Sequence, residues 1–129
     1  MGNAVRVLVV EDEMSLADAV ARGLRRHGAS VDVAYDGDDG YSLVTSAGYD
    51  VLVLDRDLPG MSGDEICRSV TDGGLPVRVL MLTASVSEQD RANGMALGAA
   101  DYVNKPFSFA DLLQRVIALA GPATTEVAQ

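Results

Sequence analysis

The chain has 129 residues and a formal net charge of −9 at pH 7. This length allows one domain with a sizeable core, and the acidic balance argues against binding of the chain itself to nucleic-acid phosphates or an anionic membrane. The single cysteine, Cys67, excludes an internal disulfide, so we expect a reducing, cytoplasmic location. Met1–Val5 lacks a signal-peptide pattern, and no apolar run is long enough to span a bilayer.

Five short runs rich in Val and Leu are the predicted strands. Several of them are apolar at nearly every position, which is typical of a parallel sheet covered on both faces. The runs are Val5–Val10, Val31–Tyr35, Val51–Leu54, Val77–Leu82 and Asp101–Val103.

Five helical patterns lie between and after these runs. In the first, Leu16, Val20 and Leu24 recur every four residues and form one apolar stripe, and Gly28 can end the helix in a left-handed conformation. The predicted helices are Met14–His27, Asp39–Ala47, Ser62–Val70, Ser87–Leu97 and Ser108–Ala120.

The regular alternation of strands and helices predicts a flavodoxin-like, doubly wound α/β sandwich with a parallel sheet of order 2-1-3-4-5. We expect one domain over residues 1–120, followed by residues 121–129 as a tail or the start of a linker. The last helix begins with Ser108, and Asp111 three residues later predicts a capping-box variant in which Asp replaces Glu or Gln.

Acidic residues follow two of the predicted strands. Glu11 and Asp12 follow the first strand and Asp55 follows the third, and these strands are neighbours in the predicted order. Two carboxylates about 5 Å apart repel by roughly 3 kcal/mol at an effective dielectric of 20, so a cation is expected between them. An oxygen-only, partly hydrated site best suits Mg²⁺, with Mn²⁺ as a possible substitute.

The remaining strand ends supply groups that suit phosphoryl transfer. Asp55 is a carboxylate nucleophile that can form an acyl phosphate. Lys105, together with the metal, can neutralise charge on the phosphoryl oxygens, and the Thr83 hydroxyl can donate to one of them. Ala84 is small and leaves the phosphate approachable. The pattern therefore predicts phosphorylation of Asp55.

Four segments resemble the receiver domains of two-component response regulators. Each is only weakly or moderately specific alone, but the four occur in the family's order, each after its own strand. The resemblance covers about residues 5 to 120. The segments are Val7–Glu13, Val53–Gly63, Met81–Ala84 and Asp101–Phe107.

The resemblance implies a role for each residue of the acidic site. Asp55 would be the phosphoacceptor and would take its phosphoryl group from a sensor histidine kinase. Glu11 and Asp12 would be the acidic metal pair, and the main-chain carbonyl of Asp57 would be a further metal ligand, together with Asp55.

The resemblance also implies a switch. Thr83 would be the switch hydroxyl and Lys105 the phosphate-binding lysine, preceding a cis peptide bond to Pro106. Phosphorylation would draw Thr83 toward the new oxygens, and Tyr102 would fill the vacated space. This would alter the face formed by the fourth helix, fifth strand and fifth helix.

The last third of the chain is similar to the OmpR/PhoB type of winged-helix transcription regulators. In that subfamily the same face forms a homodimer, and Arg91, Asp101 and Arg115 match its charged positions. Ala100 stands where the subfamily carries an acid, which would remove one ion pair. DNA binding and transcription control would require an output domain outside this chain. The similar segments are Asp90–Met95, Gly98–Val103 and Phe107–Val116.

A competing interpretation is an enzyme, because Asp55-Arg56-Asp57 looks like the nucleophile motif of haloacid-dehalogenase-type phosphatases. In those enzymes the nucleophile follows the first strand and the acidic pair comes last, whereas here Glu11 and Asp12 come first. We therefore expect no turnover enzyme, only Mg²⁺-dependent self-phosphorylation and self-dephosphorylation on an aspartate.

A cofactor carrier and a degenerate receiver would both share the predicted fold. A flavodoxin-like cofactor carrier needs a Gly/Ser/Thr-rich loop after the first strand, but Glu11, Asp12 and Glu13 would repel a phosphate there. A degenerate receiver would only bind a partner, and the complete set of site residues argues against it.

Overall fold

The computed structural model describes residues 4–84 and 87–121 and contains five strands and five helices in strict alternation. The strands are β1 (Arg6–Val10), β2 (Ser30–Ala34), β3 (Val51–Asp55), β4 (Arg78–Thr83) and β5 (Asp101–Asn104). The helices are α1 (Met14–Arg26), α2 (Gly37–Ser46), α3 (Gly63–Asp72), α4 (Glu88–Ala96) and α5 (Phe109–Ala120).

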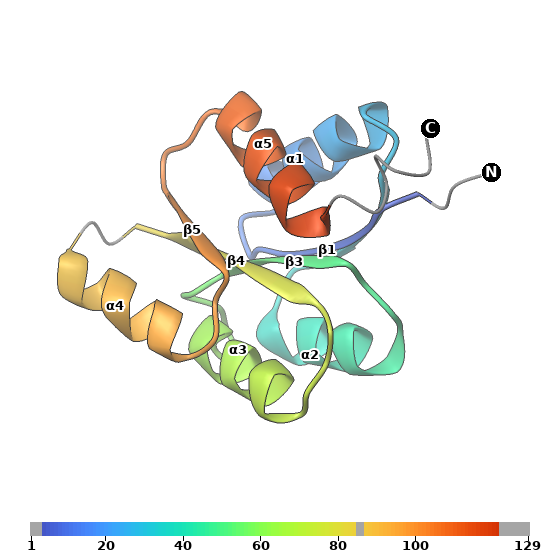
Figure 1. Ribbon diagram of the computed structural model, residues 1–129. Coiled ribbons are helices and arrows are strands. Elements are labelled where there is room, and N and C mark those ends of the chain that lie inside the picture. Colours follow the sequence, from blue (N-terminus) through green and yellow to red (C-terminus); the bar gives the residue numbers. More distant parts are fainter. Residues whose placement is uncertain (1–3, 85–86, 122–129) are drawn as a thin grey trace.

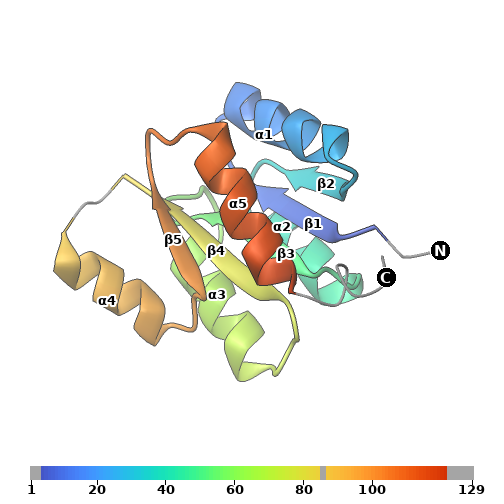
Figure 2. The ribbon, with the colours of Figure 1, turned by 45° about the horizontal axis from the view of Figure 1, so that its top comes forward.

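The strands form one parallel sheet in the order β2-β1-β3-β4-β5, which confirms the predicted topology. Helices α1 and α5 cover one face, and α2, α3 and α4 lie on the other (Figures 1 and 2). Because every pairing is parallel, the carboxyl ends of the strands share one edge of the sheet. The candidate site residues follow the strands at this edge.

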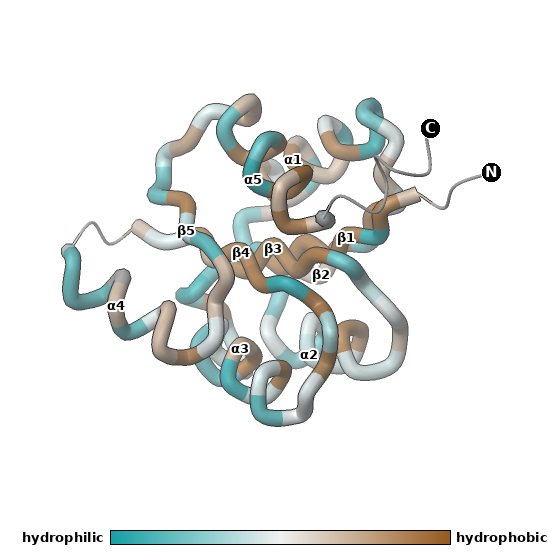
Figure 3. The backbone as a smooth tube through the Cα atoms, viewed as in Figure 1, coloured by the Kyte–Doolittle hydropathy of each residue, from teal (hydrophilic) through white to brown (hydrophobic). Residues whose placement is uncertain are grey.

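The sheet is the apolar centre of the molecule, visible as the brown band in Figure 3. One core cluster, including Leu52 and Ile66, packs between the sheet and α2 and α3. A second, including Val53 and Leu112, packs against α1 and α5. Adjacent residues of β3 therefore enter different clusters, and every residue of β3 is buried. This explains why the strand is apolar until Asp55.

Truncating a β3 side chain is expected to destabilise the fold strongly. Leu52 has no exposed surface, and Leu52→Ala should cost about 2–5 kcal/mol of unfolding free energy because it removes buried methyl groups and leaves a cavity. Ile117→Ala is the control. Ile117 is 60% exposed, so this substitution should change the unfolding free energy by no more than about 0.5 kcal/mol. Urea denaturation measures both. Similar losses for the two variants would contradict the assignment of Leu52 to the core.

The helix starts differ from prediction in ways that capping explains. α2 begins at Gly37, two residues earlier than predicted, because the Asp36 carboxylate accepts from the Asp39 N–H at 2.8 Å. The predicted capping box of α5 is only half present: Ser108 accepts from the Asp111 N–H. The short Asp111 carboxylate binds Arg115 instead.

A complete capping box that the prediction missed starts α3. The Ser62 hydroxyl accepts from the Glu65 N–H at 3.1 Å, and the Glu65 carboxylate accepts from the Ser62 N–H at 3.0 Å. α1 ends at Arg26, one residue earlier than predicted, and Gly28 has the predicted left-handed conformation, with a φ of 93°. The N-terminal caps fix where α2, α3 and α5 leave the loops of the carboxyl edge.

The predicted tail can be followed only at Gly121, and residues 122–129 lie outside the described part of the chain. Among the described residues, no helix combines the length and apolar character needed to cross a membrane.

Candidate functional site

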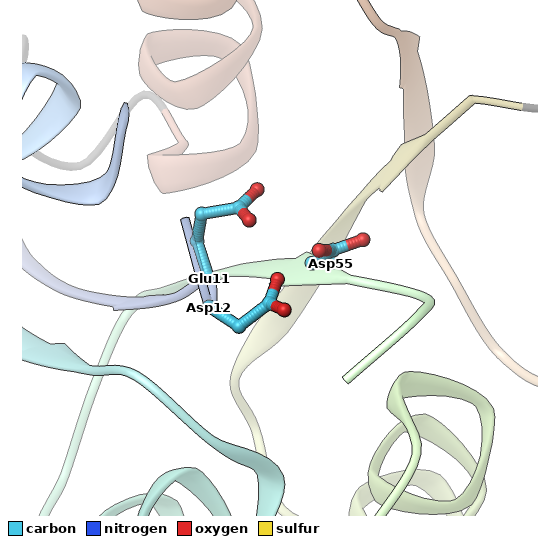
Figure 4. Close-up of side chains that lie close together, drawn as sticks. All are labelled: Glu11, Asp12 and Asp55. Carbon is cyan, nitrogen blue, oxygen red and sulfur yellow. The ribbon is translucent and has the colours of Figure 1, made fainter. Parts of the chain in front are cut away.

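Three carboxylates meet beyond the ends of β1 and β3. Glu11 and Asp12 directly follow β1, and Asp55 is the last residue of β3, the strand that pairs with β1. One oxygen from each lies within 4.8 Å of the others, and Figure 4 shows the three side chains at these neighbouring strand ends. Glu11 and Asp55 are buried and Asp12 is exposed. The cluster therefore opens to solvent through Asp12.

Lys105 reaches the same cluster from the end of β5. Its backbone N–H donates to the Thr83 carbonyl at 2.8 Å, and its peptide bond to Pro106 is cis, as expected. The Nζ atom lies 2.7 Å from Glu11 Oε1 and donates to Asp55 Oδ2 at 3.3 Å. One ammonium thus contacts two buried carboxylates.

The Asp55 carboxyl is hard to ionise in this setting. Its pKa is raised from 3.8 to about 6, chiefly by burial and to a smaller extent by the neighbouring Glu11 charge. The Asp57 N–H, which donates to Asp55 Oδ1 at 3.1 Å, and the Lys105 ammonium both lower it. Negative charge at Asp55 is therefore only partly compensated by the protein.

This pKa shift predicts a pH-dependent stability in EDTA. The raised folded-state pKa favours the neutral acid, so the contribution of Asp55 is fully present below about pH 4 and is lost as the pH rises through about 6. The unfolding free energy of the wild type, relative to Asp55→Asn, should fall by about 3 kcal/mol over that range. Urea denaturation from pH 4 to 7.5 measures it. Parallel pH profiles for the two proteins would refute the prediction.

The donor set of the cluster fits a hard divalent cation. All its side-chain ligand atoms are carboxylate oxygens, which Mg²⁺ prefers. Glu11 Oε1 is buried and accepts no well-oriented hydrogen bond from the described residues, although Lys105 is close. A buried carboxylate oxygen with spare acceptor capacity is unfavourable unless a cation or a bound water uses it. The observed residues are thus suited to Mg²⁺.

Thr83 lies next to Asp55 in the sheet. Thr83 is buried and is the last residue of β4. The residue before it, Leu82, pairs with Asp55 of β3. Thr83 also lines a pocket of about 310 Å³ at the ends of β3 and β4. The lining residues are Arg56, Asp57, Ser62, Asp64, Thr83 and Asp90. The structure therefore brings Thr83 and Asp57 to one hollow beside the carboxylates.

Tyr102 is buried in this structure, with 3% of its surface exposed. Its hydroxyl donates to the main-chain carbonyl of Asp90 in α4 at 2.7 Å. The inward position that was expected to follow phosphorylation is thus adopted here. Gly94 makes room for it, because a Cβ atom at this position would lie 1.9 Å from the Tyr102 hydroxyl oxygen.

Comparison with known proteins identifies the family to which this fold belongs. Residues 7–117 match the response regulator receiver domain family. The chain belongs to this family. Membership decides against the phosphatase and cofactor-carrier interpretations, and it makes the chain a receiver domain of two-component response regulators, which work with histidine kinases.

Relatives of this receiver domain are transcription regulators. It is 56% identical over 115 residues to the transcriptional regulatory protein CutR of Streptomyces coelicolor, covering 89% of this chain and 53% of CutR. It is 44% identical over 112 residues to DltR of Streptococcus agalactiae, covering 87% of this chain and 50% of DltR. The receiver domain thus spans about half the length of these relatives.

A solved structure supports the subfamily. Thermotoga maritima DrrB, an OmpR/PhoB homologue, is 32% identical, with a TM-score of 0.81 and coverage of 88% of this chain and 51% of DrrB. The OmpR/PhoB-like interpretation made from the last third of the sequence is therefore supported.

The residues predicted to form the dimer face of the receiver domain differ in their surroundings. Asp101 and Arg115 pair within the chain, with Arg115 Nη1 at 2.9 and 3.0 Å from the two Asp101 oxygens. Arg91 belongs to α4, but its side chain lies outside what the structure describes. Ala100 is half-buried before β5. Among the described side chains of this set, the structure brings Asp101 and Arg115 together.

Sequence analysis missed a role for Arg56 of the receiver domain. Its guanidinium forms a bidentate salt bridge with the Asp64 carboxylate of α3, with hydrogen bonds of 2.8 and 2.9 Å. It also donates to the Asp90 carbonyl of α4 at 2.9 Å. The available signal was an arginine directly after a buried strand, with an acid in the first turn of the next helix.

Proposed function

We propose that this receiver domain accepts a phosphoryl group on Asp55 from the phosphohistidine of a sensor histidine kinase. The observation that carries the proposal is the contact of one ammonium, Lys105, with two buried carboxylates beside an exposed third. Such a cluster is costly unless further positive charge joins the ammonium, and buried carboxylates of this kind are typical of functional sites.

The reaction needs one bond made and one broken. An oxygen of ionised Asp55 attacks phosphorus, the bond from phosphorus to the donor nitrogen breaks, and the imidazole leaves with its electron pair and takes up a proton. The Asp57 N–H and the Lys105 ammonium hold the Asp55 carboxylate in place before attack. Positioning and charge compensation supply most of such catalysis.

Different charged residues of the site would bind the metal and the phosphoryl group. Asp12, Asp55 and the main-chain carbonyl of Asp57 would hold Mg²⁺, with Glu11 completing the acidic pair. When bound, Mg²⁺ supplies positive charge that reduces the repulsion between the donor phosphate and the acceptor carboxylate. Lys105 shifts its ammonium from the carboxylates to a phosphoryl oxygen, and the Thr83 hydroxyl donates to another. Hydrolysis of the acyl phosphate in the same site resets it.

The switch acts on the face formed by α4, β5 and α5. Tyr102 is already buried in this structure, and movement of Thr83 toward the phosphoryl oxygens leaves further space for it, so phosphorylation stabilises the buried position of Tyr102. This face then forms a homodimer through Arg91, Asp101 and Arg115. Exposed ion pairs contribute only about 0–1 kcal/mol each, so Ala100 weakens the dimer without abolishing it.

The output is transcription control in the cytoplasm. The relatives CutR and DltR are transcriptional regulatory proteins, and the matched region spans only about half of each, so a DNA-binding output domain beyond the receiver domain would carry the DNA contacts. The receiver domain contributes the phosphorylation-dependent dimer and, with its charge of −9, no direct contact with nucleic acid.

Intact-mass spectrometry tests the proposal. The chain is incubated with acetyl phosphate or phosphoramidate, with Mg²⁺ or with EDTA. We expect a gain of one phosphoryl mass with Mg²⁺ and none with EDTA. Absence of the gain with both donors would overturn the proposal and leave a receiver fold that only binds partners.

A further inference from the structure

Arg56 directly follows Asp55 and connects the loop after β3 to two helices. Its Nε and Nη2 atoms bind the Asp64 carboxylate of α3, and Nη1 donates to the Asp90 carbonyl in the first turn of α4. The Arg56 side chain is only 13% exposed and the Asp64 side chain 40%, so these charge-assisted bonds are partly shielded from water.

The main chain of Arg56 is fixed in the loop that carries the site. Its N–H donates to the Leu82 carbonyl of β4 at 3.1 Å, and its carbonyl accepts from the Gly63 N–H at 3.0 Å. Gly63 lies so close that a Cβ atom there would be 2.2 Å from the Asp55 carbonyl oxygen. The guanidinium therefore extends from a fixed base, and movement of α4 away from this base would break its bond to Asp90.

The carbonyl of Asp90 is shared between Arg56 and Tyr102. The Tyr102 hydroxyl donates to it at 2.7 Å and the Arg56 Nη1 at 2.9 Å. Gly94, one helical turn later, is the residue that makes room for the Tyr102 hydroxyl. Both bonds thus form on the α4 face that receives the buried tyrosine.

α4 has little apolar packing that could hold it in this position. Among its described residues only Gly94 is buried, and Met95 is 46% exposed. By contrast, α1 buries Val20 and Leu24 against the sheet. A helix that buries little apolar surface depends on polar contacts for its position and opens readily when they are lost.

We propose that Arg56 is a positioning residue that couples occupancy of Asp55 to the position of α4, by holding the first turn of α4 where Tyr102 is buried. The inference rests on the proposed function, in which a phosphoryl group favours buried Tyr102 through Thr83. Arg56 and the phosphoryl group then stabilise the same arrangement. Because coupling is reciprocal, loss of the Arg56 bonds must weaken binding of a phosphoryl analogue at Asp55.

The test uses beryllofluoride with Mg²⁺ as the analogue and compares Arg56→Met with Arg68→Met. Arg68 is an exposed arginine of α3 with no hydrogen bond or ion pair to the described residues of α4, so its replacement removes the same charge from the protein and leaves those contacts intact. Calorimetric titration gives the affinity, and hydrogen exchange of residues 88–96 gives the protection of α4 with and without the analogue. Arg56→Lys keeps the positive charge but cannot form the bidentate salt bridge. It replaces Arg56→Met in the test if that variant does not fold.

We expect Arg56→Met to bind beryllofluoride at least about 5-fold more weakly than the wild type. Arg68→Met should bind it with the wild-type affinity. The analogue should also protect α4 less in Arg56→Met, with an intermediate effect in Arg56→Lys. Wild-type affinity in Arg56→Met, or faster α4 exchange by the same factor with and without the analogue, would show a purely structural role and overturn the inference. Failure of the wild type to bind the analogue would instead overturn the proposed function, and this inference with it.

Discussion

Asp55→Asn is expected to abolish the gain of phosphoryl mass completely. The amide has no anionic oxygen to attack phosphorus, and it also removes one of the carboxylates that suit the site to Mg²⁺. The fold should remain intact, because the substitution relieves the unfavourable ionisation of a buried carboxyl whose pKa is raised to about 6. Intact mass after incubation with acetyl phosphate and Mg²⁺ measures the loss.

A matched control stands two residues away. Asp57 is exposed, and its proposed role uses only the main chain, so Asp57→Asn should still gain the phosphoryl mass. The bond from its N–H to Asp55 Oδ1 is also preserved in this variant. Phosphorylation of Asp55→Asn to the wild-type extent would place the acceptor elsewhere.

Lys105→Ala is expected to slow phosphoryl transfer from acetyl phosphate by about 10²–10³-fold. The ammonium is 2.7 Å from Glu11 and 3.3 Å from Asp55, and its removal leaves two buried carboxylates without their shared cation. It also removes the donor proposed to compensate charge on the transferring phosphoryl group. Initial rates of mass gain at saturating Mg²⁺ measure the effect.

Lys105→Arg is the control, because it keeps the charge while changing its geometry, and it should retain more of the rate than alanine does. Lys105 is the only lysine of the chain, so acetylation by acetyl phosphate at a lysine side chain can occur only there, and it differs from phosphorylation in added mass. A wild-type rate in Lys105→Ala would remove the lysine from the proposed chemistry.

The strands and the carboxyl-edge residues were predictable because parallel β-sheets impose simple rules. The apolar run Val51–Leu54 indicated a central strand, and the acid after it had to lie at the ligand-binding edge. The proximity of Glu11, Asp12 and Asp55 followed from strand order alone. Helix starts were less predictable, since Asp36 and Ser62 are polar residues whose capping role depends on local backbone geometry.

Contacts between side chains from distant elements were not predictable. The Arg56 bonds depend on where α4 lies, and α4 lacks the apolar stripe that would have indicated its buried face. The intrachain pairing of Arg115 with Asp101 was unpredictable for the same reason. Sequence similarity suggested charged positions on one face, but the geometry of β5 and α5 decides which partner is near.

The central claim is that the groups at positions 12, 55, 83 and 105 serve one phosphoryl group. A crystal structure of the chain with Mg²⁺ and beryllofluoride tests it most directly. The account predicts beryllium bonded to an Asp55 carboxylate oxygen, with the Lys105 ammonium and the Thr83 hydroxyl each within hydrogen-bond distance of a fluoride. Beryllofluoride bound at another residue, or Lys105 still directed at Glu11 and away from the fluorides, would contradict it.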